Sequence, residues 1–122
     1  MKSKDNISLP SYGIIDPDYA RVYTKIRCTA WGYGYAALMH GSFTRDLDIL
    51  LVPWVENITI TPEHLIMAIC RKSKLVSNGH PPTLKPHGRL SFTLMFKEFA
   101  DPRFIDIGIM PSSVQLIAND NT

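Results

Sequence analysis

Two aspartates, Asp46 and Asp48, stand one residue apart at the start of a long aliphatic run. In an extended segment, residues two apart point the same way, so both carboxylates would face one side of a strand. Neighbouring carboxylates repel one another and are costly to bury. The pair therefore indicates a bound cation, hydrogen-bond donors, a salt bridge from Arg45 or open solvent at the beginning of this strand.

A third acid, Asp106, interrupts the apolar segment 104–111. Alternation there puts Asp106 and Gly108 on one face and three isoleucines on the other. The preceding segment, 89–97, alternates strictly as well. If the two segments form a hairpin beside the first strand, Asp106 reaches the same face as the other two acids, with Ser91 and Thr93 nearby.

Three carboxylates on one polar sheet face form a site of hard oxygen ligands suited to Mg²⁺ or Mn²⁺. A pair of such ions stabilises both the attacking and the leaving oxygen of a phosphoryl displacement. The alternative is a solvated strand entrance, in which the first two acids pair with Arg45 and Asp106 is a hydrogen-bonded edge residue.

The elements that would position these acids follow from capping and periodicity. Asp16 with Pro17 and Thr61 with Pro62 are N-cap signatures, and apolar residues recur after them at helical spacing. We expect helices over residues 16–31 and 62–75. Strands are expected over these residues: 35–42, 47–54, 89–97 and 104–111. Segment 47–54 is typical of a central strand covered on both faces for much of its length, and the proline-rich segment 77–88 predicts a loop.

The composition is that of one compact globular domain, with 122 residues, 45% hydrophobic and 20% charged positions, and the expected helices and strands make it an α/β (α+β) domain. We expect an N-terminal arm over 1–15, one domain over 16–111 and a tail over 112–122. Cys28 and Cys70 belong to no metal-binding or disulfide pattern and are expected to be small buried hydrophobes. A net charge of +2 identifies no partner. No apolar run approaches the ~18 residues of a membrane span, which predicts a cytoplasmic protein without a membrane partner.

The Gly41-Ser42 turn after an apolar strand, the Asp46-Leu47-Asp48 triplet and the later Asp106 resemble the signature of the DNA polymerase β-like nucleotidyltransferase superfamily. The sequence is particularly similar to small nucleotidyltransferase-like proteins of phages and prophages. They share a Gly-Ser-x-x-Arg-Asp-Leu-Asp run that ends in Pro-Trp and a later His-Gly-Arg segment, here 87–89. The resemblance covers roughly residues 17 to 111.

The resemblance implies a minimal mixed sheet with helices on one face and metal-dependent transfer of a nucleotidyl group from a nucleoside triphosphate to an unknown acceptor. It implies Asp46 and Asp48 as Mg²⁺ (or Mn²⁺) ligands and Asp106 as third ligand or as base toward the acceptor hydroxyl. The nucleotide would meet four residues: Gly41, Ser42, Arg45 and Arg89.

A binding module is the alternative function. Only three residues separate the Gly-Ser turn from the first acid, whereas most active relatives have about ten there, and no second domain clamps the acceptor. A phage protein of this fold would then capture a nucleotide or a host protein in the host cytoplasm. An enzyme this small would take its acceptor surface from the substrate, a partner or a second copy in a homo-oligomer.

Other residue types that could do chemistry have structural interpretations. His40 is expected to be a strand-end histidine, and His80 and His87 are expected on a surface loop. Arg89 could meet a phosphate bidentately or pair with a carboxylate, conceivably Asp106. The aromatic residues of segment 31–35 could stack on a base, but packing at a helix end is the simpler role.

Overall fold

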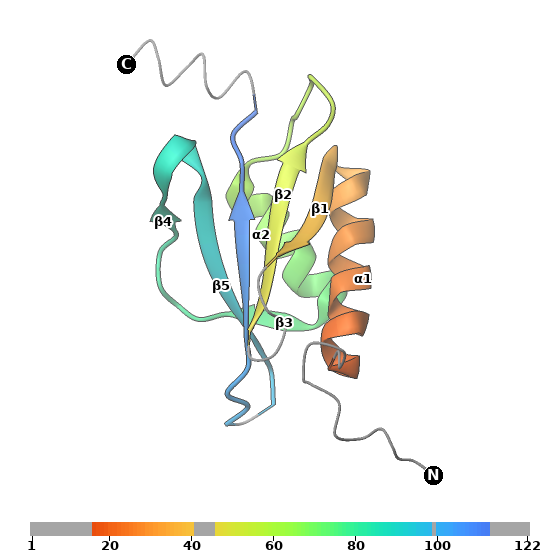
Figure 1. Cartoon of the computed structure of the whole chain (residues 1–122), viewed down its shortest axis with the longest axis vertical. Coiled ribbons are helices and arrows are strands. Elements are labelled where there is room, and N and C mark those ends of the chain that lie inside the picture. The colour runs from red at the N-terminus through yellow and green to blue at the C-terminus, as the bar shows by residue number, and fades with distance from the viewer. Residues whose placement is uncertain (1–15, 41–45, 99, 113–122) are drawn as a thin grey trace.

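In the part of the chain that the structure describes, one mixed β-sheet with two helices on a single face makes up the fold (Figure 1). The computed structural model describes residues 16–40, 46–98 and 100–112, so the predicted arm and almost all of the tail lie outside the described residues. The expected α/β (α+β) class, a mixed sheet with helices packed on one face, is confirmed.

The elements of the described chain follow one another in this order: α1 (Pro17–Gly32), β1 (Tyr35–His40), β2 (Leu47–Pro53), α2 (Pro62–Ser73), β3 (Leu75–Ser77), β4 (Thr83–Leu84), the 3-10 turn η2 (Pro86–Gly88), β5 (Leu90–Phe96) and β6 (Phe104–Ile109). The sheet order is β1-β2-β6-β5-β3, and β4 pairs with β5. The β2 and β6 strands are parallel, and the other pairs are antiparallel. The last strand therefore enters the centre of the sheet, beside the strand that begins with the acids.

Both helices begin at the caps that the sequence indicated. The Asp16 carboxylate accepts a hydrogen bond from the backbone N–H of Asp18 at 2.8 Å, and the Thr61 hydroxyl accepts one from the N–H of His64 at 3.2 Å. These side chains satisfy donors that the first helical turn leaves unpaired. At its other end α2 is closed by Lys74 in the left-handed conformation, with φ of 60°.

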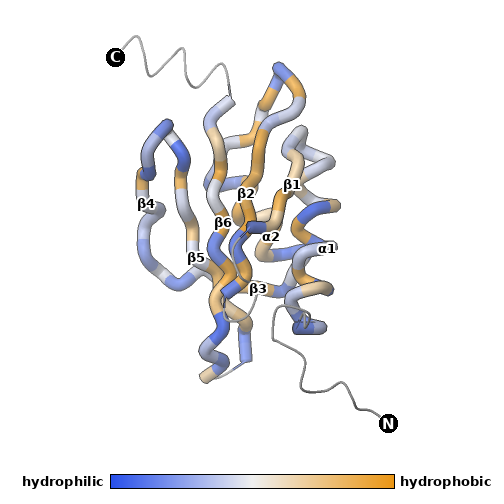
Figure 2. Tube along the Cα trace, in the orientation of Figure 1, coloured by the Kyte–Doolittle hydropathy of each residue, from blue (hydrophilic) through white to orange (hydrophobic). Residues whose placement is uncertain are grey.

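The core lies between the helices and one sheet face. Alternate residues of β2, β5 and β6 are buried there against the apolar stripes of the helices, and hydrophobic residues concentrate along β2 (Figure 2). The fully buried strand residues include Leu47, Ile49, Leu51, Leu94, Ile105 and Ile107. The residues between them are half-buried, so the expectation that β2 is covered on both faces is wrong. We call the face of the sheet away from the helices the open face.

Three further expectations need correction. The α2 helix ends at Ser73, two residues before the expected end at residue 75, because Lys74 takes the left-handed conformation, and β3 begins at Leu75. The predicted loop 77–88 contains β4 and the η2 turn, since Thr83 and Leu84 pair with β5. Cys28 is exposed on α1 and Cys70 is half-buried, so only the second resembles a core residue.

An arginine ties the beginning of α1 to the turn before β6. The Arg103 guanidinium lies 2.9 Å from Asp16, 2.9 Å from Asp18 and 2.7 Å from Asp101. It also covers the Phe96 ring at 4.2 Å from the ring centroid. We call these residues the Arg103 cluster.

Candidate functional site

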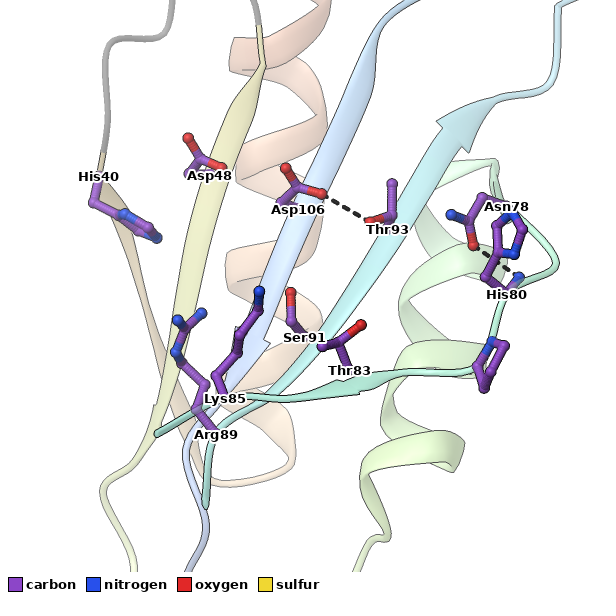
Figure 3. Close-up of a pocket in the computed structure, with 12 residues that line it drawn as sticks. His40, Asp48, Asn78, His80, Thr83, Lys85, Arg89, Ser91, Thr93 and Asp106 are labelled. Atoms are coloured by element: carbon purple, nitrogen blue, oxygen red, sulfur yellow. Dashed lines mark hydrogen bonds between the residues drawn. The ribbon is translucent and has the colours of Figure 1, made fainter. Parts of the chain in front are cut away.

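Asp48 and Asp106 lie side by side on the open face. In the parallel pairing of β2 with β6, these two residues are directly opposite one another. Both are half-buried, and both side chains project from the open face in Figure 3. The two acids therefore lie together on one sheet face, as the sequence predicted.

Polar residues extend this row across the sheet. His40 of β1 pairs with Asp48, and Thr93 of β5 pairs with Asp106. The Thr93 hydroxyl donates a hydrogen bond to Asp106 Oδ1 at 2.9 Å (Figure 3). This bond fixes the orientation of the Asp106 carboxylate.

The electrostatics of Asp48 reflect its neighbours. Burial raises the pKa of Asp48 above its ordinary value, and the charge of Asp106 and a hydrogen bond between the two carboxyl groups raise it further. The charge of His40 acts in the opposite direction. Because paired carboxyls favour a shared proton or a cation, this arrangement is suited to binding positive charge.

Two cations approach the acids from the other end of the same face. Lys85 follows β4 and Arg89 precedes β5, and both side chains reach toward the acids in Figure 3. Among the described residues, neither cation has a carboxylate within 4.0 Å, so the expected alternative of an Arg89–Asp106 ion pair is not what the structure shows.

Gly108 makes the position of Arg89 possible. A Cβ at Gly108 would lie 2.8 Å from Arg89 Nη1 and 2.9 Å from Arg89 Cδ. The Arg89 side chain therefore lies over Gly108. This glycine is two residues from Asp106 on the same strand, β6. A larger residue at position 108 would displace the guanidinium.

Acids and cations line one cavity of about 440 Å³. Its remaining lining is polar or small, and it comprises His40, Asn78, His80, Pro81, Thr83, Ser91, Thr93 and Gly108. The backbone N–H of His80 donates to Asn78 Oδ1 at 3.0 Å, which holds the far wall in place. The cavity thus has a negative end at the acids, a positive end at Lys85 and Arg89, and hydroxyl groups between them.

Several predicted site residues lie elsewhere. Asp46 is exposed, just before β2, and is not among the residues that line the cavity, although its charge contributes to the raised pKa of Asp48. Gly41, Ser42 and Arg45 lie outside the described residues. Trp31 stacks on Trp54 with 4.4 Å between ring centroids, which agrees with a packing role.

A divalent metal is compatible with the two central acids. Within the described ranges, no group of three or more His, Cys, Asp or Glu side chains is placed to hold a metal ion. Magnesium, however, commonly binds through one or two carboxylates and takes its other ligands from water and substrate phosphates. Asp48 and Asp106 fit that donor set.

Sequence reasoning missed the part of the site contributed by segment 78–85. His80 is exposed, as expected for a surface loop, but it also lines the cavity, and Lys85, Thr83 and Asn78 are not identified by the sequence analysis. Their signal was available in principle: Thr83 and Leu84 can extend as a strand, and a strand paired with β5 brings its neighbours over the polar face.

No described helix has the length and apolar character needed to cross a bilayer. Compared with known proteins, the chain matches no family model and no curated protein.

Proposed function

We propose that the protein binds the metal complex of a nucleoside triphosphate on the open face and transfers its nucleotidyl group to an acceptor hydroxyl. The observation that carries this proposal is the parallel register of β2 and β6, which sets Asp48 opposite Asp106 in a cavity that also holds two cations with no carboxylate partner among the described residues. Adjacent carboxylates next to two cations are suited to binding a metal cation and a polyanionic ligand together.

Each group has a role in this proposal. Asp48 and Asp106 would hold Mg²⁺ or Mn²⁺, which when bound would neutralise charge on the reacting phosphate. Lys85 and Arg89 bind the phosphate oxygens, and Arg89 does so with the planar fork that suits phosphate. Thr93 orients Asp106 through its 2.9 Å hydrogen bond.

The transfer conserves atoms and charge. The acceptor oxygen bonds to the α-phosphorus while the bond from that phosphorus to the bridging oxygen of the β-phosphate breaks. Pyrophosphate leaves, and the acceptor's proton passes to the Asp106 carboxylate. Since most of the catalysis in such reactions comes from positioning and charge stabilisation, the fixed arrangement of acids and cations is the relevant feature.

A second candidate function is binding without transfer. The position of Asp46 favours it, because the acid expected as a metal ligand is exposed and outside the cavity lining. The same cavity would then capture a nucleotide, or the open face would contact a host protein, with no chemical step.

Transfer is tested by labelling. The protein is incubated with bacterial lysate, Mg²⁺ or Mn²⁺, and each of ATP, GTP, CTP and UTP carrying radiolabel on the α- or the γ-phosphate. Relative to the same lysate without the protein, we expect one α-labelled triphosphate to give additional labelling of a macromolecule and its γ-labelled form to give none, because nucleotidyl transfer releases the γ-phosphate with pyrophosphate.

The Asp48→Asn variant should lose at least 100-fold of this labelling, since removal of one charge-stabilising group typically costs 10²–10³ in rate. Glu56→Gln is the matched control, because Glu56 is an exposed acid outside the cavity. If no triphosphate labels any acceptor while Mn²⁺-triphosphate still binds, the binding module replaces the enzyme.

A further inference from the structure

A second, apolar cavity adjoins the polar one on the open face. It measures about 330 Å³ and is lined by Leu38, Met39, Leu50, Pro86 and Met110, with His40, His87 and Arg89 also on its walls. His40 and Arg89 line both cavities. A ligand held in the polar cavity can therefore extend into this apolar slot past two shared residues.

The floor of the slot is an apolar pair, of which Leu38 is exposed and Leu50 is half-buried. Leu38 of β1 lies directly opposite Leu50 of β2, and Leu38 is 53% exposed. Both leucines face the same side as the acids, because Leu50 is two residues after Asp48. Large apolar side chains that remain exposed on an otherwise polar face indicate a surface that a ligand covers.

The wall of the slot is preformed. The η2 turn carries His87 at φ of 68°, an uncommon conformation for a residue other than glycine, followed by Gly88 at φ of 77°. The turn is held in place from two sides. Lys85 donates its backbone N–H to the carbonyl of Arg89 at 2.7 Å, and a Cβ on Gly88 would lie only 3.2 Å from Pro111.

We infer that this apolar slot receives the nucleobase of the bound nucleotide, an inference that rests on the proposed function. Two residues along a strand span about 6 to 7 Å. The leucine pair is therefore separated from the acids that would hold the reacting phosphate by about the length of one ribose. The apolar floor contacts the flat face of the base, while the His87 imidazole at the wall stacks on it or bonds to its edge. The remaining phosphates stay in the polar cavity, where Lys85 lies.

The inference is tested by calorimetric comparison of ligands with and without a base. The probes are Mn²⁺-tripolyphosphate and the Mn²⁺ complexes of ATP, GTP, CTP and UTP. We expect at least one nucleotide to bind about tenfold or more tightly than tripolyphosphate, because only the nucleotide places apolar surface in the slot.

Two variants locate the difference. Leu38→Thr keeps a strand-forming residue but removes apolar surface, and should weaken the preferred nucleotide about three- to tenfold while tripolyphosphate binding is unchanged. Leu84→Thr is the matched control, since Leu84 is 70% exposed on β4 and lines neither cavity.

His87→Gly removes the imidazole and relieves the positive φ. It should therefore weaken nucleotide binding while the melting temperature stays equal or rises.

The alternatives give different results. Equal affinity for tripolyphosphate and every nucleotide, unaffected by either variant, overturns the slot and leaves the triphosphate site of the proposed function intact. If Leu38→Thr weakens tripolyphosphate equally, the leucine acts on the whole site and the base assignment fails. A dimer without ligand that Leu38→Thr dissociates assigns the slot to a second copy. If neither tripolyphosphate nor any nucleotide binds, the proposed function fails and the slot inference fails with it.

Discussion

Gly108 shows how one missing side chain shapes the candidate site. Its neighbour across the strand pair is Ser91, and the space above it is taken by the Arg89 side chain. The sequence predicts that Gly108 shares a face with Asp106, but it does not indicate which group occupies the space over the glycine. The structure assigns that room to the guanidinium, which connects the polar cavity to the apolar slot.

Gly108→Ala should therefore weaken triphosphate binding more than it weakens the fold. The new methyl group would lie within 3 Å of Arg89 Nη1 and Cδ, so the arginine side chain must move away from the acids. We expect about tenfold weaker binding of Mn²⁺-tripolyphosphate by calorimetry, since a displaced arginine loses a charge-assisted hydrogen bond. The melting temperature should change by only a few degrees.

Gly32→Ala provides the matched control for this substitution. No atom lies within 4 Å of a Cβ built at Gly32, which is the last residue of α1 and lies outside both cavities. It should leave tripolyphosphate binding unaltered. Unaltered binding in Gly108→Ala as well would show that the observed arginine position does not matter for anions.

At the scale of elements, the Arg103 cluster joins the first helix to the central strand β6. Hydrogen bonds from Arg103 lower the pKa of Asp101. Burial raises the pKa of Asp16, but hydrogen bonds from Arg103 and the Asp18 backbone and the charge of Arg103 outweigh it and lower the pKa overall. Since both acids have folded pKa values below their unfolded ones, their stabilisation is present above the ordinary value of 3.8 and is lost as pH falls through the folded values.

Arg103→Gln should lower the thermal stability of the protein and make that stability less sensitive to low pH. We expect the melting temperature at pH 7 to fall by about 5 °C, since the substitution removes the shared partner of three partly exposed carboxylates and the cation over Phe96. Below pH 4 the difference from the parent protein should shrink. Thermal melts from pH 7 to pH 2 measure both effects, with the exposed Arg27→Gln on α1 as control. A constant difference across this range would count against the ion pairs as its cause.

How far the sequence predicts these elements depends on how local their signals are. The caps at Asp16 and Thr61 and the strict alternation of residues 90–96 are local, and the helices and β5 are where these signals placed them. Strict alternation also placed Asp106 on the same sheet face as Asp48. Once two strands are known to be adjacent, the odd or even position of a residue along its strand decides which face its side chain occupies. The short strands β3 and β4 have two or three residues each, too few for a period, and depend on pairing with β5.

The whole molecule has two unlike sides. One side of the sheet is covered by α1 and α2, and the described elements leave the acids, the cations and the apolar slot on the other side (Figure 1, Figure 3). Segment 78–89 runs over the edge of this open face and contributes residues to both cavities. Its residues are exposed or half-buried, and it is stabilised by the short β4 pairing and by turn hydrogen bonds.

This asymmetry predicts where a ligand changes hydrogen exchange. Mn²⁺-triphosphate should slow amide exchange in segment 78–89, because a ligand bound to Lys85 and Arg89 suppresses local opening of the elements that carry them. The amides of α1 and α2 should exchange at unchanged rates, since the core separates them from the open face. Mass spectrometry of peptides from the free and ligand-bound protein measures both, and the Asp48→Asn, Asp106→Asn double variant should show no slowing. Slower exchange confined to the helices would place the ligand on the opposite side of the molecule from the acid pair.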